Sequence, residues 1–260
     1  MVAGNDAWSK WKLAVPTLLA VVLATGCEQP LAGSCENWNT PAYFNSATPD
    51  EVRICIDSGA DISAQGPRGL LPIHGAAASS SHPAVILQLL DAGADLQAES
   101  GGGGTALHFS GLNPNPAIAR TLVHEGAELE ARDADGMTAL HFAAALARNA
   151  AAITVLVEAG AELESRAKEN LTPLQIAASM NSNPEIIEAL LMYGADSNAR
   201  LETGNTSLHL AVLNSVDPSV IRALLKGGAD PDIRNELGET PLDVAEQTDN
   251  ELAIAALLGL

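Results

Sequence analysis

Aromatic and basic residues are both scarce in this chain of 260 residues. Phe, Trp and Tyr make up only 3% of the sequence, so a folded core must be built from Ala, Leu, Ile and Val, which suit thin, closely stacked layers. Lys and Arg number 13 against 32 Asp and Glu, a formal net charge of -19. This balance argues against nucleic acid and anionic lipid headgroups as partners, because proteins bind both mainly through cations. The hydrophobic fraction of 47% is too high for a disordered acidic chain.

The first 27 residues differ in composition from the rest of the chain. Two lysines precede an apolar run over residues 13–23, which is shorter than the about 20 residues that span a bilayer and is typical of a secretory signal peptide. The run ends in Ala24-Thr25-Gly26-Cys27. Small residues before a Cys resemble a bacterial lipobox, although Ala24 stands where that motif usually has Leu. The resemblance implies a signal peptide over residues 1–26 and lipidation of Cys27.

This leader predicts the location of the protein. We expect an exported chain, either periplasmic or anchored as a lipoprotein in the outer membrane, with no other contact to the membrane. Glu28 follows the Cys, so the Asp that retains enterobacterial lipoproteins in the inner membrane is absent. Ordinary cleavage and an uncleaved anchor remain the alternatives.

Two further cysteines, Cys35 and Cys55, follow the leader. In an exported chain an even pair suggests a disulfide. It would close a loop of about 20 residues and constrain the amino-terminal end of the fold. The alternative is two separate thiols, with Cys55 filling a core position.

From residue 59 onward the sequence repeats about every 34 residues. A Gly-Ala-Asp or Gly-Ala-Glu triplet begins at Gly59, Gly93, Gly126, Gly160, Gly194 and Gly228, with spacings of 34, 33, 34, 34 and 34. A second marker keeps the same period at Thr105, Thr138, Thr172, Thr206 and Thr240. Two markers in phase over five or six copies predict a stack of structural repeats.

The second marker opens a motif that resembles the ankyrin repeat, a unit of about 33 residues with the pattern T-P-L-H-x-A. The copies read Leu71-Pro72-Ile73-His74, Thr105-Ala106-Leu107-His108, Thr138-Ala139-Leu140-His141, Thr172-Pro173-Leu174-Gln175, Thr206-Ser207-Leu208-His209 and Thr240-Pro241-Leu242-Asp243. The resemblance implies an all-α repeat solenoid of stacked helix-turn-helix units with β-hairpin fingers. After a tether over residues 27–39, the array of about seven units is expected at 40–65, 66–99, 100–132, 133–166, 167–200, 201–234 and 235–260.

The residues between the markers agree with two short helices in each unit. Small residues such as Ala143-Ala144-Ala145 suit a first helix that packs closely on its neighbours. Asn-Pro or Asp-Pro then predicts the start of a second helix, because Asn or Asp accepts an unpaired backbone N–H and Pro fits the first turn. Apolar pairs four residues apart, such as Ile186-Ile187 and Leu190-Leu191, give this helix one buried face.

Two positions in each unit are expected to have a positive φ angle. The Gly of each Gly-Ala triplet should end the second helix in this conformation. The other position is the turn of the finger, which holds Gly69, Gly103, Gly136, Asn170, Gly204 and Gly238. Asn is the residue other than Gly that best tolerates such a position.

The polar residues do not form the pattern of an enzyme or a metal site. Four of the six histidines share one repeat position: His74, His108, His141 and His209. The resemblance implies that this His is buried and bonded to the backbone and to the Thr hydroxyl. The other two have no Cys or His at ligand spacing, and the run Gly101–Gly104 lacks the Lys-Ser/Thr pair of a phosphate loop. We therefore expect no catalytic residue, no metal and no cofactor.

The resemblance implies a non-enzymatic scaffold that binds a protein on its concave face, formed by the finger tips and the first helices. Carried over by repeat position, the expected contact residues are Arg68, Leu70, Ser79, Gly104, Leu112, Asp135, Met137, Leu146, Lys168, Glu169, Leu171, Met180, Glu202, Asn205 and Leu213. Five of them should form an exposed apolar stripe: Leu70, Met137, Leu146, Leu171 and Met180. Alternatively, some of the five shield the junction between finger and helix.

The expected partner is a protein of unknown identity, for example an exported protein with a basic patch, and the chain itself is expected to be a monomer. The alternative function is a structural or protective protein of the bacterial cell envelope with no dedicated partner.

Overall fold

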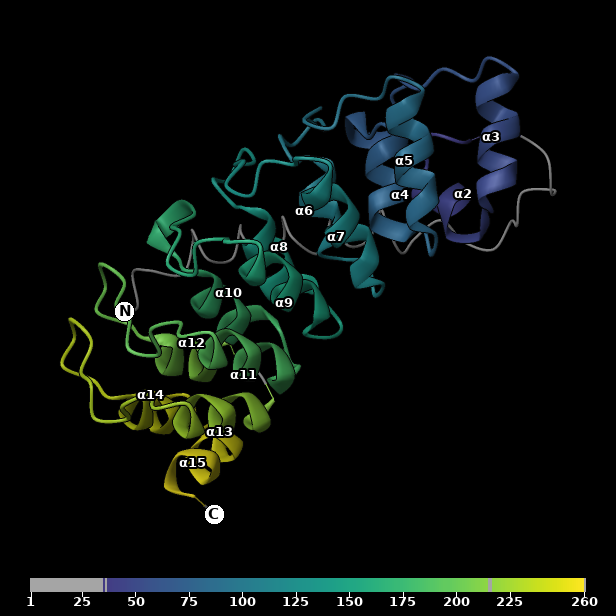
Figure 1. Cartoon of the computed structure of the whole chain (residues 1–260). Coiled ribbons are helices and arrows are strands. Elements are labelled where there is room, and N and C mark those ends of the chain that lie inside the picture. Colours follow the sequence, from purple (N-terminus) through teal and green to yellow (C-terminus); the bar gives the residue numbers. More distant parts are fainter. Residues whose placement is uncertain (1–34, 36, 215–216, 260) are drawn as a thin grey trace.

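The computed structural model describes residues 35, 37–214 and 217–259. The predicted signal peptide, the lipidation site Cys27 and the terminal Leu260 lie outside these residues. The described part of the chain consists of short helices and turns that follow one another in a single curved stack (Figure 1). No helix within it is long and apolar enough to cross a bilayer.

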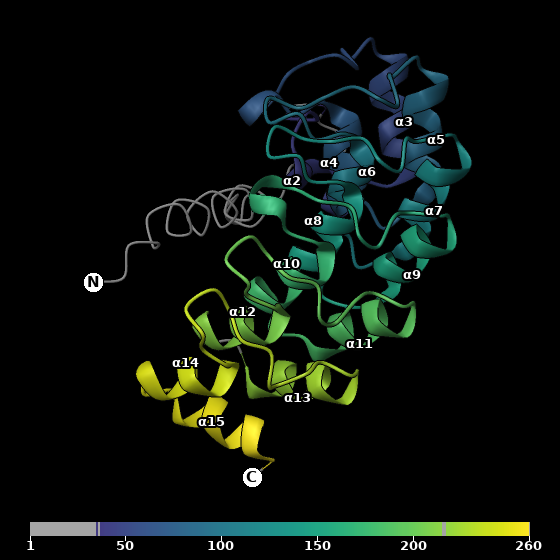
Figure 2. The ribbon, with the colours of Figure 1, turned by 90° about the vertical axis from the view of Figure 1, so that its left-hand side faces the viewer.

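The helices of the described residues form seven pairs in two layers. The first helices are α2 (Pro41–Ser46), α4 (Pro72–Ser79), α6 (Ala106–Ser110), α8 (Ala139–Leu146), α10 (Pro173–Met180), α12 (Ser207–Leu213) and α14 (Pro241–Gln247). The second helices are α3 (Pro49–Asp57), α5 (Pro83–Asp91), α7 (Pro116–His124), α9 (Ala151–Glu158), α11 (Pro184–Met192), α13 (Pro218–Lys226) and α15 (Glu251–Leu258). Each helix contacts the helix of its own layer in the next pair. The second helices lie on the convex side of the curve and the first helices on the concave side (Figure 2).

Six fingers connect the pairs and project on the concave side (Figure 2). We number them 1 to 6, at residues 59–71, 93–105, 126–138, 160–172, 194–206 and 228–240. The prediction of β-hairpins is wrong, because the described residues contain no strand. One backbone hydrogen bond joins the two sides of each finger, as from Gly66 N–H to the Leu70 carbonyl at 2.8 Å. A single bond of this kind does not make a β-ladder. The tips of fingers 1 and 4 are single 3-10 turns, η1 (Pro67–Gly69) and η2 (Lys168–Asn170).

Positive φ angles occur where the sequence predicts them. The helix-ending glycines have φ angles between 84° and 103°. At the finger turns, the five glycines and Asn170 have φ angles between 64° and 80°. Arg68 and Glu169 precede two of these residues and also have positive φ angles, 59° and 58°, which the sequence did not indicate. Non-glycine residues rarely adopt this region, so the tips of fingers 1 and 4 are held by their surroundings.

Asn and Asp side chains begin most of the second helices, as predicted. The carboxamides of Asn115 and Asn183 accept a backbone N–H two residues further on, at 3.1 and 3.0 Å, and Asp217 does the same at 2.8 Å. The amide of Asn183 also donates to the carbonyl of Arg148 in the preceding unit at 2.9 Å. The Asn183 side chain therefore bonds a backbone N–H of its own helix and also joins two units. His82 holds the equivalent place in α5 but makes no capping bond.

A buried side chain at the start of each first helix from α4 to α12 also joins successive units. Nδ1 of His108 accepts the N–H of Thr105 at 3.0 Å, and its Nε2 donates to the carbonyl of Met137 in the next finger at 2.9 Å. The other three histidines of this position repeat the arrangement. Gln175 makes the equivalent bonds through its amide at 3.0 and 2.8 Å.

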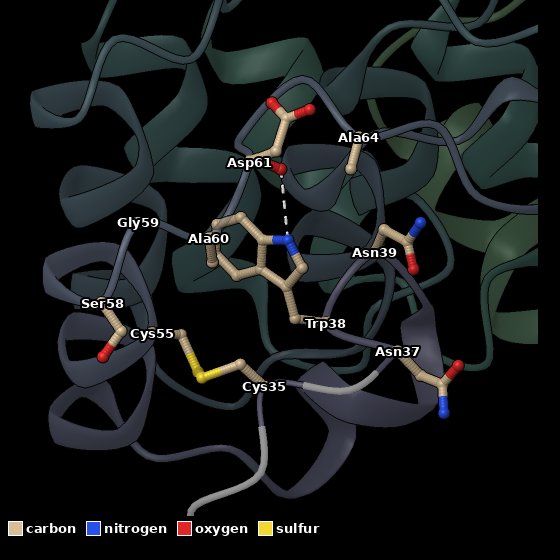
Figure 3. A pocket seen from close by; sticks show the side chains of 10 residues that line it. All are labelled: Cys35, Asn37, Trp38, Asn39, Cys55, Ser58, Gly59, Ala60, Asp61 and Ala64. Atoms are coloured by element: carbon tan, nitrogen blue, oxygen red, sulfur yellow. Dashed lines mark hydrogen bonds between the residues drawn. A yellow bond between two sulfur atoms is a disulfide. The ribbon is translucent and has the colours of Figure 1, made fainter.

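The segment expected as a tether is partly folded onto the first unit. Cys35 and Cys55 are joined in a disulfide, with Cα atoms 5.5 Å apart. Trp38 is buried, and its indole N–H donates to the carbonyl of Asp61 at 3.2 Å (Figure 3). Residues 37–39 therefore close the amino-terminal end of the stack and are not a free tether.

The buried histidines make the fold sensitive to acid. Burial lowers the pKa of His141 to about 4, and burial also lowers the pKa of His74, His108 and His209. The unfolded chain, with ordinary His pKa values near 6.5, therefore binds more protons between about pH 6.5 and 4. The stability from each neutral His is complete above pH 6.5 and is lost as the pH falls, by about 3 kcal/mol for His141.

His141→Gln tests this account, because Gln175 already fills the same position with two hydrogen bonds. At pH 7.5 the free energy of unfolding should change by less than about 1 kcal/mol. Between pH 7.5 and 4.5 the variant should lose about 2–3 kcal/mol less than the parent chain. Urea denaturation followed by circular dichroism measures both values. His124→Gln on the exposed face of α7 is the control, and a pH dependence that both variants leave unchanged would contradict the prediction.

Candidate protein-binding surface

The charged residues predicted for contact lie at the finger tips on the concave side. Arg68, Lys168, Glu169 and Glu202 are exposed, and Asp135 is half-buried. Lys168 Nζ lies 2.6 Å from Asp135 Oδ1, which joins the tips of fingers 3 and 4. The hydrogen bond to Asp135 and the charge of that carboxylate raise the pKa of Lys168. Exposed ion pairs add little stability, so the pair mainly fixes where these two charges lie.

Three of the apolar residues predicted to be exposed are buried, so the predicted stripe is wrong at these positions. Leu70, Met137 and Leu171 are only 5%, 3% and 1% exposed. Met137 and Leu171 belong to a second hydrophobic cluster, which also contains Phe142 of α8 and Leu201 of finger 5. This outcome matches the alternative interpretation, in which such residues shield the junction between finger and helix. Their burial holds the fingers against the first helices.

Four apolar side chains at or just after the ends of consecutive first helices remain accessible and form what we call the apolar column. The column consists of Leu112, Leu146, Met180 and Leu213. The first three side chains are half-buried, and Leu213 is 46% exposed. The first helix of the preceding unit ends in Ser79 and that of the following unit in Gln247, so the column is polar at both ends. Adjacent helices pack about 8–10 Å apart, so its four side chains extend over roughly 25–30 Å.

Charge is unevenly distributed on the concave side. Finger 2 has the uncharged tip Gly101-Gly102. Towards the carboxyl end, fingers 5 and 6 carry Glu202, Glu236 and Glu239. Leu237, at the tip of finger 6, is 78% exposed, and the sequence analysis did not include it among the contact residues. The face is therefore apolar in its middle and acidic towards its carboxyl end.

The fingers also carry a ladder of arginines, which the contact residues predicted from the sequence do not include. The ladder consists of Arg132, Arg166, Arg200 and Arg234. Arg132 donates to the carbonyl of Arg166 at 2.7 Å, and Arg200 donates to the carbonyl of Arg234 at 2.8 Å. The signal was present, because an Arg recurs every 34 residues in a chain with only 13 basic residues. The side chains of Arg132 and Arg200 each attach one finger to the next.

The described residues offer no obvious centre for chemistry. No three His, Cys, Asp or Glu side chains among them lie close enough together to hold a metal ion. A shallow depression lies between Trp38, the disulfide and residues 58–61 (Figure 3). Asp61 is the one charged residue among the described residues that line it, and its carboxylate accepts a hydrogen bond from the Ser63 hydroxyl at 2.6 Å. The depression therefore lacks the paired groups of an acid-base or nucleophilic site.

The difference between buried and accessible leucines can be measured. Leu171→Ala should lower the free energy of unfolding by about 3 kcal/mol, because the surrounding cluster cannot fully close the cavity. Leu213→Ala, on the accessible column, should lower it by less than about 1 kcal/mol. Urea denaturation gives both values. Similar effects from the two substitutions would mean that the cluster under the fingers is not a packed core.

Comparison with known proteins agrees with this architecture. A family model of ankyrin repeats, three copies long, matches residues 112–201 and 177–259. Among 521 solved chains with a significant match is the crystal structure of the ankyrin repeat domain of Bcl-3, described as a member of the IkappaB family. It is 28% identical, has a TM-score of 0.61, and the match covers 94% of this chain and 98% of that one. No curated protein sequence matches significantly. Since the family model covers more than half of the sequence, this chain belongs to the ankyrin-repeat family.

Proposed function

We propose that this protein is a non-enzymatic scaffold of the bacterial cell envelope that binds another protein on its concave face. The observation that carries the proposal is the apolar column, because Leu112, Leu146, Met180 and Leu213 stay accessible in four consecutive units. Soluble monomers rarely leave aligned apolar side chains accessible unless a partner covers them. Ankyrin-repeat proteins are interaction scaffolds, and repeat stacks generally bind partners along their extended concave surfaces.

The finger tips supply the polar border of the proposed surface. Arg68 lies at the amino-terminal side, the paired Lys168 and Asp135 in the middle, and Glu202 towards the carboxyl end. An apolar centre with a polar border is the usual anatomy of a protein interface. The predicted contact residues Ser79 and Asn205 are half-buried and fit this border. Leu70, Met137 and Leu171 act below the surface and are not included in it.

The location in the envelope is proposed from the leader sequence. The apolar run before Cys27 is typical of a signal peptide, and a disulfide between Cys35 and Cys55 is stable only in an oxidising compartment. Both features favour export, either as a periplasmic protein or as a lipoprotein of the outer membrane.

Crosslinking of the purified protein in envelope extract, followed by mass spectrometry, tests the binding face. Leu213→Glu should reduce recovery of the crosslinked partner by more than about tenfold, because a charge in the column is left unpaired in the interface. Met192→Glu is the matched control, since this side chain is 73% exposed on the second-helix layer. Equal losses with both variants would contradict the assignment of the concave face. Absence of any partner at all salt concentrations would favour the structural envelope protein instead.

Export and lipidation are tested by fractionation. Cys27→Ala should move the protein from the membrane fraction to the soluble periplasmic fraction, because a lipid chain supplies the membrane affinity. A free-thiol assay on this variant should detect no thiol, since Cys35 and Cys55 are paired. If the variant stays with the membrane, the lipid is not what holds it there.

A further inference from the structure

We propose that the partner inserts a basic, partly apolar segment between the tips of fingers 4 and 5, an inference that rests on the proposed function above. We call this place the seam. Its borders are the tip residues Glu169 and Glu202. Met180 of the apolar column packs on the hydrophobic cluster that contains Leu171 and Leu201 of the same two fingers.

Backbone hydrogen bonds join the tips of neighbouring fingers everywhere except at the seam. The N–H of Gly101 donates to the Arg68 carbonyl at 2.9 Å, and equivalent bonds of 2.9–3.0 Å join finger 3 to 2, finger 4 to 3 and finger 6 to 5. The equivalent bond between Glu202 N–H and the Glu169 carbonyl is absent from the described residues. Fingers 4 and 5 are thus the one adjacent pair, among these six, whose tips are not bonded.

The arginine ladder is interrupted at the same place. Arg132 bonds across to finger 4 and Arg200 bonds across to finger 6. Arg166 lies between them and donates within its own finger, to the Asn170 carbonyl at 2.7 Å. No bond from Arg166 to finger 5 occurs among the described residues. Fingers 4 and 5 therefore lack both the backbone bond and the arginine bond that join other neighbouring fingers.

Asn170 sits at the turn position that holds a glycine in the other five fingers. A Cβ atom on Gly69, Gly103 or Gly204 would lie 2.7–2.9 Å from a backbone nitrogen of the next finger, whereas one on Gly136 would lie 3.6 Å from it. The Cβ atom of Asn170 therefore excludes the close spacing found after fingers 1, 2 and 5, and allows only the wider spacing found after finger 3. The bases of the two fingers remain joined, because Glu164 accepts a backbone N–H of finger 5 at 2.9 Å. Only the bond between the tips is missing.

The seam presents groups that fit a cationic side chain beside an apolar one. The Glu169 carbonyl and the Glu202 N–H have no hydrogen-bond partner among the described residues. Both side chains are exposed and take part in none of the ion pairs found there. Met180 packs on the cluster that contains Leu171 of finger 4 and Leu201 of finger 5. Apolar surface therefore lies next to two carboxylates that no cation neutralises.

An extended segment with Arg or Lys beside Leu, Ile or Val matches this arrangement. Its cation would pair with the two carboxylates, and its backbone could use the free carbonyl and N–H as an added strand does. Lys168 does not compete, because it is paired with Asp135. A second copy of this chain is a poor occupant, since two molecules that each carry -19 repel one another.

Fluorescent heptapeptides that alternate Leu with Arg, Gln or Glu test the proposal by anisotropy on the whole protein. The Leu/Arg peptide should bind about tenfold more tightly than the Leu/Gln peptide, and the Leu/Glu peptide should not bind. The double variant Glu169→Gln, Glu202→Gln should weaken the Leu/Arg peptide about tenfold. Its matched control is Glu128→Gln, Glu162→Gln, which removes the same charge at the finger bases and should change binding by less than about twofold.

Asn170→Gly tests the geometry of the seam apart from its charge. Removal of the Cβ atom should let the tips of fingers 4 and 5 approach, so the Leu/Arg peptide should bind at least about fivefold more weakly. Circular dichroism and the melting temperature check that every variant remains folded.

Three results would overturn the seam proposal. Equal weakening by both double variants would mean diffuse attraction by net charge, and unchanged binding in Asn170→Gly would place the peptide elsewhere. Association of the protein with itself in sedimentation, lost in Glu169→Gln, Glu202→Gln, would make a second copy the occupant. The broader function is judged separately, because partner recovery that depends on Leu213 can persist when the seam proposal fails.

Discussion

The orientation of the fingers depends on one repeated interaction, the bridge made by the buried His or Gln at the start of the inner first helices. Its ring or amide accepts an N–H of its own helix and donates to a carbonyl of the following finger, as His108 does between Thr105 and Met137. A buried polar side chain is costly unless its hydrogen bonds are made. The bridge therefore fixes the following finger on its helix, and the position of that finger determines which side chains reach the concave surface.

The concave surface consists of the side chains that this packing of fingers on first helices leaves accessible. Fingers that stand on the first helices cover Met137 and Leu171, which become core residues. The carboxyl ends of the first helices and the turn after α6 are less covered, so the apolar column stays accessible. Neighbouring fingers also bond through their backbones, and at Gly69, Gly103 and Gly204 the close approach leaves no room for a Cβ atom. Asn170 carries a Cβ atom at this position, and the bond from finger 5 to its finger is absent from the described residues.

Much of the fold followed from residues whose physical role does not depend on distant context. The period of 34 residues, the positive φ angles of the glycines and the capping by Asn115 and Asn183 all depend on local geometry. The second cluster did not follow, because a Leu or Met before the repeated Thr can face either the helix or the solvent, and only the position of the finger decides which. The seam did not follow either. Asn170 was correctly expected to adopt a positive φ angle, yet the effect of its Cβ atom appears only once the neighbouring backbone is in place.

The two ends of the stack are held differently. A disulfide and the buried Trp38 close the amino-terminal end. At the other end, α15 is covered on one side only, and Leu252 and Leu258 are exposed on it. In a stack stabilised by contacts between neighbours, separation of units starts at the end with the weakest hold and proceeds one unit at a time. We therefore expect the described units to open from α15 towards α2, so that the acidic end of the concave face is lost first and the Trp38 end last.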